Sequence, residues 1–299
     1  MNGAAREMDG MAVQRPRRPR ELQDSLNHYV YHPLAWRLAR QLARTPITPN
    51  MVSVVGGMFV VAAAAAYAQP WWPVSALLGM ALHMGWHVVD GADGDLARMT
   101  GRSSPLGELV DGLCDYLSHI VLYIVLAWLL QQQIGPIAWF YTVLAGASHI
   151  VQANHVEVQR RSYQWWVYGV PWLRNTQGQG AARQIKSVFG FIVDAYLRLA
   201  VGMTPHAQRI DEAVAAAKDV PEELHRIRGH VQEEAPALLR ILKVLGPNPR
   251  AIVLGLSMLA GSPLYYFLYQ TVVLNLLLAF SVRRHNAAAQ RIAGRILPA

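Results

Sequence analysis

The chain has 299 residues, of which 53% are hydrophobic and only 15% are charged. Soluble proteins carry about 25% charged residues, so this composition excludes an ordinary soluble domain. The net charge is +8, from 27 Lys and Arg against 19 Asp and Glu. The single cysteine, Cys114, excludes an intramolecular disulfide framework and any cysteine-based metal site. The polar, arginine-rich start of the chain lacks an apolar core, so we expect no cleavable signal peptide.

The N-terminal region is basic and leads into a short amphipathic segment. Residues 1–32 are predicted to be a disordered basic arm. Pro33 suits the first position of a helix, which then carries three leucines on one face with arginines beside them: Leu34, Leu38 and Leu42 with Arg37, Arg40 and Arg44. This pattern predicts a helix that lies in the cytoplasmic interface of a membrane.

Six apolar runs approach the roughly 20 residues that span a bilayer. They are Val52–Ala68, Val74–Val89, Leu109–Leu130, Ile137–His155, Ala251–Ala260 with its flanks, and Leu264–Val282. The connections after the first, third and fifth runs carry no charge, whereas arginines gather in the others. By the positive-inside rule the basic segments are cytoplasmic. The positive charge therefore follows topology, and we expect no nucleic-acid partner.

A long polar region separates the fourth and fifth runs. Its apolar stretch 187–203 is short and contains Asp194 and Arg198, so we expect an interfacial helix there. After Pro221, apolar residues recur at helical spacing and predict a cytoplasmic helix. The aromatic residues that follow the fourth run are typical of an interfacial belt: Tyr163, Trp165, Trp166, Tyr168 and Trp172.

These patterns predict an all-α integral membrane protein. It would have six transmembrane helices, an N-terminal interfacial helix and a cytoplasmic helical insertion. The predicted parts are the arm 1–32, the interfacial helix and first four spans 33–160, the cytoplasmic or interfacial insertion 161–245, and the last two spans with the tail 246–299.

Five aspartates cluster at the junction of the second and third spans: Asp90, Asp93, Asp95, Asp111 and Asp115. In a helix, Asp90 and Asp93 share a face, and Asp111 and Asp115 lie one turn apart. Ser104 is a suitable cap for the third span, with Pro105 at its first position. We therefore expect two helix ends to aim four carboxylates at one another, and Asp95 to be a solvated residue of the inner loop.

Four like charges at the edge of a bilayer repel one another, so they either hold protons or bind cations. Ligands that are all oxygen suit Mg²⁺ or Mn²⁺ better than Zn²⁺. Two such ions roughly 4 Å apart clamp a diphosphate. Small residues beside the aspartates leave room for a nucleotide or its phosphates: Gly91, Gly94, Ala97 and Gly107.

The spacing Asp-x-x-Asp-Gly-x-x-Ala-Arg, eight residues, Gly-x-x-x-Asp-x-x-x-Asp resembles that of the CDP-alcohol phosphotransferases. All eight fixed positions match: Asp90, Asp93, Gly94, Ala97, Arg98, Gly107, Asp111 and Asp115. The resemblance also covers the six spans and the interfacial helix, which is followed by Thr48, Pro49 and Asn50. It does not obviously cover residues 163–234.

The resemblance implies an integral membrane enzyme of phospholipid biosynthesis, and it suggests a homodimer. From the charge distribution we expect a multi-pass protein of the inner cell membrane with its active site facing the cytoplasm. The enzyme would transfer a phosphatidyl group from CDP-diacylglycerol to a hydroxyl acceptor and release CMP, with two Mg²⁺ or Mn²⁺ ions. The metal ligands would be Asp90, Asp93, Asp111 and Asp115, with Asp115 also the general base. The nucleotide site would comprise Asp90, Gly94, Ala97, Arg98 and Gly107, with Arg98 paired to an aspartate or a phosphate.

The acceptor is less well defined. The polar end of the fourth span offers candidate acceptor-binding residues: His149, Asn154, Glu157, Arg160 and Arg161. Adjacent arginines suit a phosphorylated polyol, yet arginines there also mark topology. Four further residues either line the acceptor or lipid pocket or form hydrogen bonds between helices: His83, Trp86, His87 and His119.

Three alternatives stay open. Residues 103–109 somewhat resemble the choline and ethanolamine phosphotransferase branch, which uses a CDP-amino alcohol with diacylglycerol as acceptor. A cation or proton transporter also places acids within membranes, but near the midplane and often with inverted repeats, which this sequence lacks. A non-catalytic scaffold would not need all eight motif positions.

Overall fold

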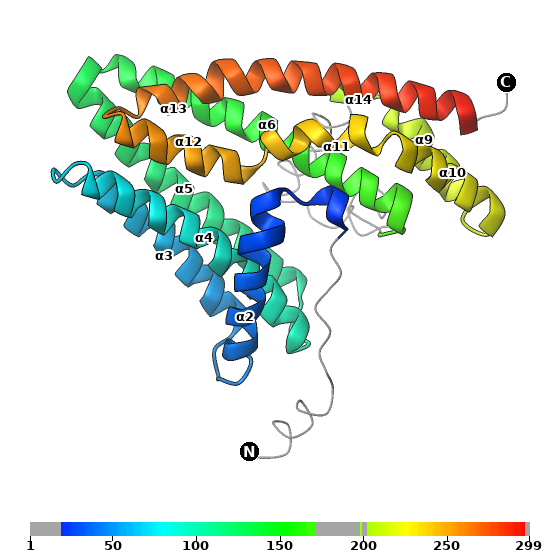
Figure 1. Ribbon diagram of the computed structural model, residues 1–299, viewed down its shortest axis with the longest axis horizontal. Coiled ribbons are helices and arrows are strands. Elements are labelled where there is room, and N and C mark those ends of the chain that lie inside the picture. Colours follow the sequence, from blue (N-terminus) through cyan, green and yellow to red (C-terminus); the bar gives the residue numbers. More distant parts are fainter. Residues whose placement is uncertain (1–18, 171–197, 199–201, 297–299) are drawn as a thin grey trace, which may run out of the picture. The chain divides into compact units, whose positions relative to one another are not determined.

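The computed structural model describes residues 19–170, 198 and 202–296, and every regular element in these ranges is helical (Figure 1). The chain divides into two compact units, which are described separately. The first unit comprises Met1–Leu144 and Pro247–Leu268. The second comprises Ala145–Gly246 and Tyr269–Ala299. The boundaries of the four predicted parts stay a prediction.

The first unit begins with a 3-10 turn, η1 (Arg20–Leu22), a π-turn, η2 (Asn27–Tyr31), and α2 (His32–Leu42). The helical run starts at Ser25, where the Asp24 carboxylate accepts a hydrogen bond of 2.9 Å from the Asn27 backbone N–H. Pro33 lies in the first turn of α2, close to the predicted position, but the helical run begins earlier because Asp24 caps it and the π-turn leads into α2.

One face of α2 is fully buried through Ala35 and Ala39. These alanines pack in a cluster with Ala92 and Leu96 of α4 (Val74–Met99). Small side chains let the two helix backbones approach closely. The opposite face exposes Leu34 and the arginines. Two of the three predicted face leucines, Leu38 and Leu42, pack against the buried cluster instead, and contact of α2 with a membrane stays a prediction.

Helices α4 and α5 (Pro105–Ile134) both pack against α3 (Pro49–Tyr67) (Figure 1). Each of α3 and α5 starts with a hydroxyl cap followed by proline. Thr48 Oγ1 accepts from the Met51 N–H at 3.3 Å, and Ser104 Oγ accepts from the Gly107 N–H at 3.0 Å. The predicted cap of the third span is thus confirmed.

Glycine allows α3 and α5 to meet. A Cβ at Gly57 of α3 would lie 3.4 Å from the carbonyl oxygen of Cys114 on α5. Cys114 itself is half-buried and forms no disulfide. The contact brings the middle of α3 against the part of α5 that carries the predicted site.

Among the described residues, three helices are long and apolar enough to cross a membrane: Pro49–Tyr67, Gly107–Ile134 and Leu264–Ile296. The other three predicted spans correspond to α4, α6 (Ile137–Tyr168) and α12 (Pro247–Leu259). With 13 residues, α12 is about 20 Å long, which is shorter than the roughly 30 Å hydrocarbon core of a bilayer. Six transmembrane helices therefore stay a prediction.

In the second unit, three short helices pack on α14 (Leu274–Ile296): α9 (Ala207–Ala216), α10 (Pro221–Glu233) and α11 (Ala235–Val244) (Figure 1). The helix expected after Pro221 is thus confirmed. Ile227 and Val231 are buried, as expected of an amphipathic helix. The last predicted span, Leu264–Val282, is extended in the structure, because α14 continues to Ile296 and the three short helices pack on it. Almost all of the apolar segment 187–203 lies outside the described residues.

Two of the aromatic residues after the fourth span are buried in a core, whereas Tyr168 is exposed and Trp172 lies outside the described residues. Helix α6 continues to Tyr168, and Tyr163 and Trp166 are only 1% and 0% exposed. The Trp166 indole N–H donates a 2.7 Å hydrogen bond to Asp211 of α9. A buried indole needs such an acceptor, and α9 supplies it. The expectation of an interfacial belt is therefore wrong for these two residues.

Ion pairs join α14 to the turn between α10 and α11. Arg291 donates two hydrogen bonds of 2.8 Å to the carboxylate of Glu234, and Arg295 donates one of 2.9 Å to Glu233. The hydrogen bond from Arg291 holds the pKa of the Glu234 carboxyl below its usual value. Ion pairs as well as apolar packing therefore hold the C-terminal part of α14 against α10 and α11.

Candidate active site

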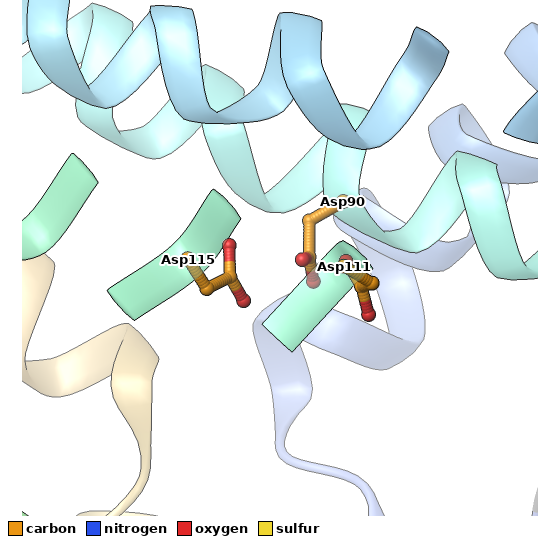
Figure 2. Close-up of side chains that lie close together, drawn as sticks. All are labelled: Asp90, Asp111 and Asp115. Carbon is orange, nitrogen blue, oxygen red and sulfur yellow. The ribbon is translucent and has the colours of Figure 1, made fainter. Parts of the chain in front are cut away.

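Three carboxylates converge between α4 and α5 of the first unit (Figure 2). Asp90 comes from α4, and Asp111 and Asp115 come from successive turns of α5. One carboxylate oxygen from each lies within 4.8 Å of the other two. All three residues are half-buried. The structure thus brings together side chains that are up to 25 positions apart in sequence (115 − 90 = 25).

Asp93 adjoins this cluster from α4. Its side chain is buried, and its Oδ2 accepts a 2.6 Å hydrogen bond from Ser53 Oγ of α3. Its Oδ1 accepts from the backbone N–H of Gly94. The Asp93 carboxyl also lies within hydrogen-bonding reach of the Asp111 carboxyl. All four predicted carboxylates are therefore neighbours, and α3 supplies a fixed donor to one of them.

The charges of this cluster require either protonation of some of the carboxylates or a bound cation. Two carboxylates 4.8 Å apart repel by roughly 3.5 kcal/mol at an effective dielectric constant of about 20. Three such pairs would destabilise the packing of α4 on α3 and of α5 on α3. A donor set made of carboxylate oxygens matches the preference of Mg²⁺ and Mn²⁺. The residues present therefore fit a divalent cation.

Asp115 is held by groups on both helices. The Trp86 indole N–H of α4 donates a 3.0 Å hydrogen bond to Asp115 Oδ1. The backbone carbonyl of Asp115 accepts from His119 Nδ1 at 2.8 Å and from Ser118 Oγ at 3.0 Å. The side chain and the backbone of this residue are thus both engaged.

The predicted histidines surround the Trp86 ring. The ring centroids of His83, His87 and His119 lie 5.8, 4.5 and 4.7 Å from that of Trp86. His83 and His87 are buried, and neither His83 Nδ1 nor His87 Nε2 has a hydrogen-bond partner among the residues that the structure describes. The histidines therefore pack on the tryptophan that touches Asp115.

Asp95 differs from its expectation. Its side chain is buried, with the residue only 3% exposed, and its Oδ1 accepts a 2.5 Å hydrogen bond from Arg98. The expectation of a solvated loop residue is wrong because α4 stays helical as far as Met99 and turns Asp95 inward. Of the two partners predicted for Arg98, the structure shows the aspartate.

The small residues of the motif have different neighbours. A Cβ at Gly91 would lie 3.2 Å from the Ala35 Cβ, so this glycine serves the packing of α2 on α4 and not a ligand. A Cβ at Gly94 would contact the Arg98 guanidinium at 3.5 Å. A Cβ at Gly107 would lie 3.2 Å from Ser104 Oγ. A nucleotide site at Gly94, Ala97, Arg98 and Gly107 stays a prediction.

The predicted acceptor-binding residues His149, Asn154, Glu157, Arg160 and Arg161 lie on the part of α6 that belongs to the second unit. Glu157 accepts hydrogen bonds from Arg160 at 2.7 Å and from Arg161 at 2.6 Å. The two guanidinium groups are therefore engaged with one carboxylate. Their role toward an acceptor stays a prediction.

The sequence reasoning overlooked a buried polar seam between α6 and the final helical run. Gln152 donates to the Gln270 carbonyl at 2.9 Å and to Asn275 Oδ1 at 2.7 Å. His155 lies 3.0 Å from the Ser281 hydroxyl. The positions 152, 155 and 159 share a helix face, and this spacing of polar residues within an apolar run was the available signal.

Three apolar helices long enough to cross a membrane and a carboxylate cluster between α4 and α5 are the features of a membrane protein with a centre suited to divalent cations. A sequence profile of the CDP-alcohol phosphatidyltransferase family matches residues 46–198, about half of the chain. The chain belongs to this family, whose members transfer substituted phosphate groups and use divalent metals.

Two known proteins show the similarity at the level of individual sequences. An archaetidylinositol phosphate synthase of Aeropyrum pernix is 37% identical over 99 residues, which cover 30% of this chain and 47% of that protein. An uncharacterized CDP-alcohol phosphatidyltransferase class-I family protein of Dictyostelium discoideum is 33% identical over 109 residues, which cover 33% of this chain and 26% of that protein. The chain thus spans about half of the first relative and about a quarter of the second.

Proposed function

We propose that the protein transfers a phosphatidyl group from CDP-diacylglycerol to the hydroxyl of a small polar acceptor and releases CMP. The observation that carries this proposal is the convergence of Asp90, Asp111 and Asp115 on the motif of the family, with one oxygen from each within 4.8 Å. Family membership supports the reaction class. The nucleotide residues Gly94, Ala97, Arg98 and Gly107 belong to the same proposal.

The carboxylates would hold one or two Mg²⁺ or Mn²⁺ ions, with Asp90, Asp93, Asp111 and Asp115 as ligands. A bound ion would neutralise charge on the diphosphate and polarise its oxygens. Asp115 would accept the proton of the acceptor hydroxyl as its oxygen attacks the phosphorus that bears the lipid. The anhydride bond between the two phosphorus centres breaks, and CMP leaves with the electron pair.

A phosphorylated polyol is the acceptor that we favour. One relative is named as a synthase of archaetidylinositol phosphate, a lipid that carries a phosphorylated polyol. Arg160 and Arg161 offer the planar, bidentate donors that suit a phosphate. A phosphate would have to compete with Glu157, which now accepts from both arginines. This exchange would make binding depend on the charge of the acceptor.

The runner-up is transfer from CDP-choline or CDP-ethanolamine to diacylglycerol, which would use the same carboxylates. The resemblance of residues 103–109 to that branch is the feature that favours it. A cation or proton transporter is a distant alternative. The four aspartates are positions of the CDP-alcohol phosphotransferase motif, and the sequence shows no inverted repeat of the kind that transporters often have.

The proposal also includes the membrane location, the orientation and the oligomeric state of the protein. We place the protein in the inner cell membrane as a multi-pass homodimer with its carboxylates at the cytoplasmic face. The arginines of α2, the Arg98–Arg102 segment and the basic end of α14 support that orientation.

Release of CMP by the purified protein tests the proposal. The donors would be CDP-diacylglycerol, or CDP-choline with diacylglycerol, each with Mg²⁺ or Mn²⁺. The acceptor panel would be inositol phosphate, glycerol phosphate, inositol and serine. We expect CMP release from CDP-diacylglycerol that requires both a metal and a phosphorylated acceptor. Release only from CDP-choline would establish the runner-up, and silence with every donor would refute the transferase.

A further inference from the structure

We propose that Trp86 is a positioning residue for Asp115: its indole N–H fixes the carboxylate in the orientation in which it binds metal and accepts the acceptor proton. This inference rests on the proposed function. It adds to the motif a residue that lies outside it, four positions before Asp90 on α4.

The first observation is the hydrogen bond itself. Trp86 Nε1 lies 3.0 Å from Asp115 Oδ1, which is a normal length for an N–H donor. A carboxylate has two oxygens and about four acceptor positions, so one N–H leaves capacity for an ion and for a proton. The indole is a donor only and does not ionise, so it orients the carboxylate without competing for the proton.

The second observation is that the indole has little freedom to move. Trp86 is buried, and the rings of His83, His87 and His119 surround it. On the α3 side, a Cβ at Gly56 would lie 3.6 Å from the indole Cδ1. Packing on several sides fixes the ring, and a fixed ring transmits its orientation to Asp115. Groups that support metal ligands in this way generally change affinity or activity 10- to 100-fold when removed.

The second unit provides a matched control. Trp166 is also buried and donates its indole N–H to an aspartate, Asp211, at 2.7 Å. That aspartate is not part of the motif. Replacement of Trp166 by Phe therefore removes the same kind of hydrogen bond without touching the carboxylate cluster, and separates positioning from a general loss of stability.

The test compares Trp86→Phe, Trp166→Phe and the wild type in detergent, after each is shown to be folded by size-exclusion chromatography and thermal melting. Mn²⁺ affinity is measured by calorimetry, and CMP release gives kcat and KM for the CDP-linked donor. For Trp86→Phe we expect Mn²⁺ affinity and kcat each to fall by about 10-fold or more, with KM for the donor within about twofold of wild type. Trp166→Phe should keep wild-type values of all three.

A second comparison asks whether Trp86 acts through Asp115. In an Asp115→Ala background the acceptor of the hydrogen bond is gone, so adding Trp86→Phe should not lower Mn²⁺ affinity further. If Trp86→Phe does not fold, 3-benzothienylalanine at position 86 keeps the shape of the ring and replaces only the N–H by sulfur. The same losses are expected for that variant.

Three results would overturn the proposal: wild-type Mn²⁺ affinity and kcat without the indole N–H, an equal loss in Trp166→Phe, or an additive loss in the Asp115→Ala background. Mn²⁺ binding does not depend on turnover. A wild-type protein that binds Mn²⁺ and releases no CMP from any donor would therefore refute the proposed function while the positioning role is still measured.

Discussion

Replacement of Asp115 by Asn tests the centre of the proposed chemistry. The change keeps the volume of the side chain and an oxygen that accepts from the Trp86 N–H, whose hydrogen bond to Asp115 measures 3.0 Å. It removes the negative charge and with it the ability to take up the acceptor proton. Because Asp115 is only half-buried and one repulsive partner of Asp90 and Asp111 disappears, folding should be preserved.

The expected size of the effect follows from two losses. A positioned general base contributes about 10²- to 10⁴-fold to a rate. The same substitution also leaves only three of the four proposed carboxylate ligands to hold the metal. We therefore expect kcat for CMP release to fall at least about 10³-fold, which corresponds to about 4 kcal/mol in the activation free energy.

The assay is CMP release at saturating metal and donor, with thermal melting as the check on folding. Asp211→Asn is the control, since Asp211 also accepts an indole N–H but lies in the second unit. It should retain activity. An Asp115→Asn protein with more than about one tenth of wild-type kcat would show that another group takes the proton, and the assignment of the base would be wrong.

Three further substitutions probe the carboxylate site, the ion pairs of the second unit and the helix packing of the first unit. Ser53→Ala removes the 2.6 Å donor to Asp93 and should weaken Mn²⁺ binding by about 10-fold in calorimetry, whereas unchanged affinity would show that this donor is dispensable. Glu234→Gln should lower the free energy of unfolding by up to about 1 kcal/mol, because it breaks the pair with Arg291. The lowered pKa of Glu234 means that this contribution is complete above its ordinary value of 4.5 and is lost as the pH falls through the lowered value, so wild type and variant should melt alike in strong acid. Gly79→Ala would place a Cβ 2.5 Å from the ring of the tyrosine that ends α3, so its melting temperature should fall by several degrees, and an unaltered melt would contradict this packing.

The sequence was sufficient to predict the local features that depend on short spacing. The Ser104 cap, the helix after Pro221 and the alignment of Asp111 with Asp115 follow from one to three turns of helix, and each is present. The family follows from eight residues at fixed spacing, and the profile match confirms it.

Features that depend on a partner helix could not be predicted in this way. Asp95 looked like a solvated loop residue, whereas α4 continues to Met99 and the Asp95 side chain is buried in the packed first unit. Trp166 looked like a residue of the membrane interface because its acceptor, Asp211, lies 45 positions away. Gly91 looked like room for a nucleotide, whereas Ala35 packs against it. In each case the missing information was which surface covers the residue.

The single cysteine gives this chain a ready chemical handle. Cys114 is half-buried and directly precedes Asp115 on α5. A thiol reagent, a spin label or a fluorophore therefore has one point of attachment in the entire sequence, without removal of other cysteines. Inactivation by such a reagent would be assigned to one position from the outset, and protection by a CDP-linked compound would report occupancy beside the carboxylates.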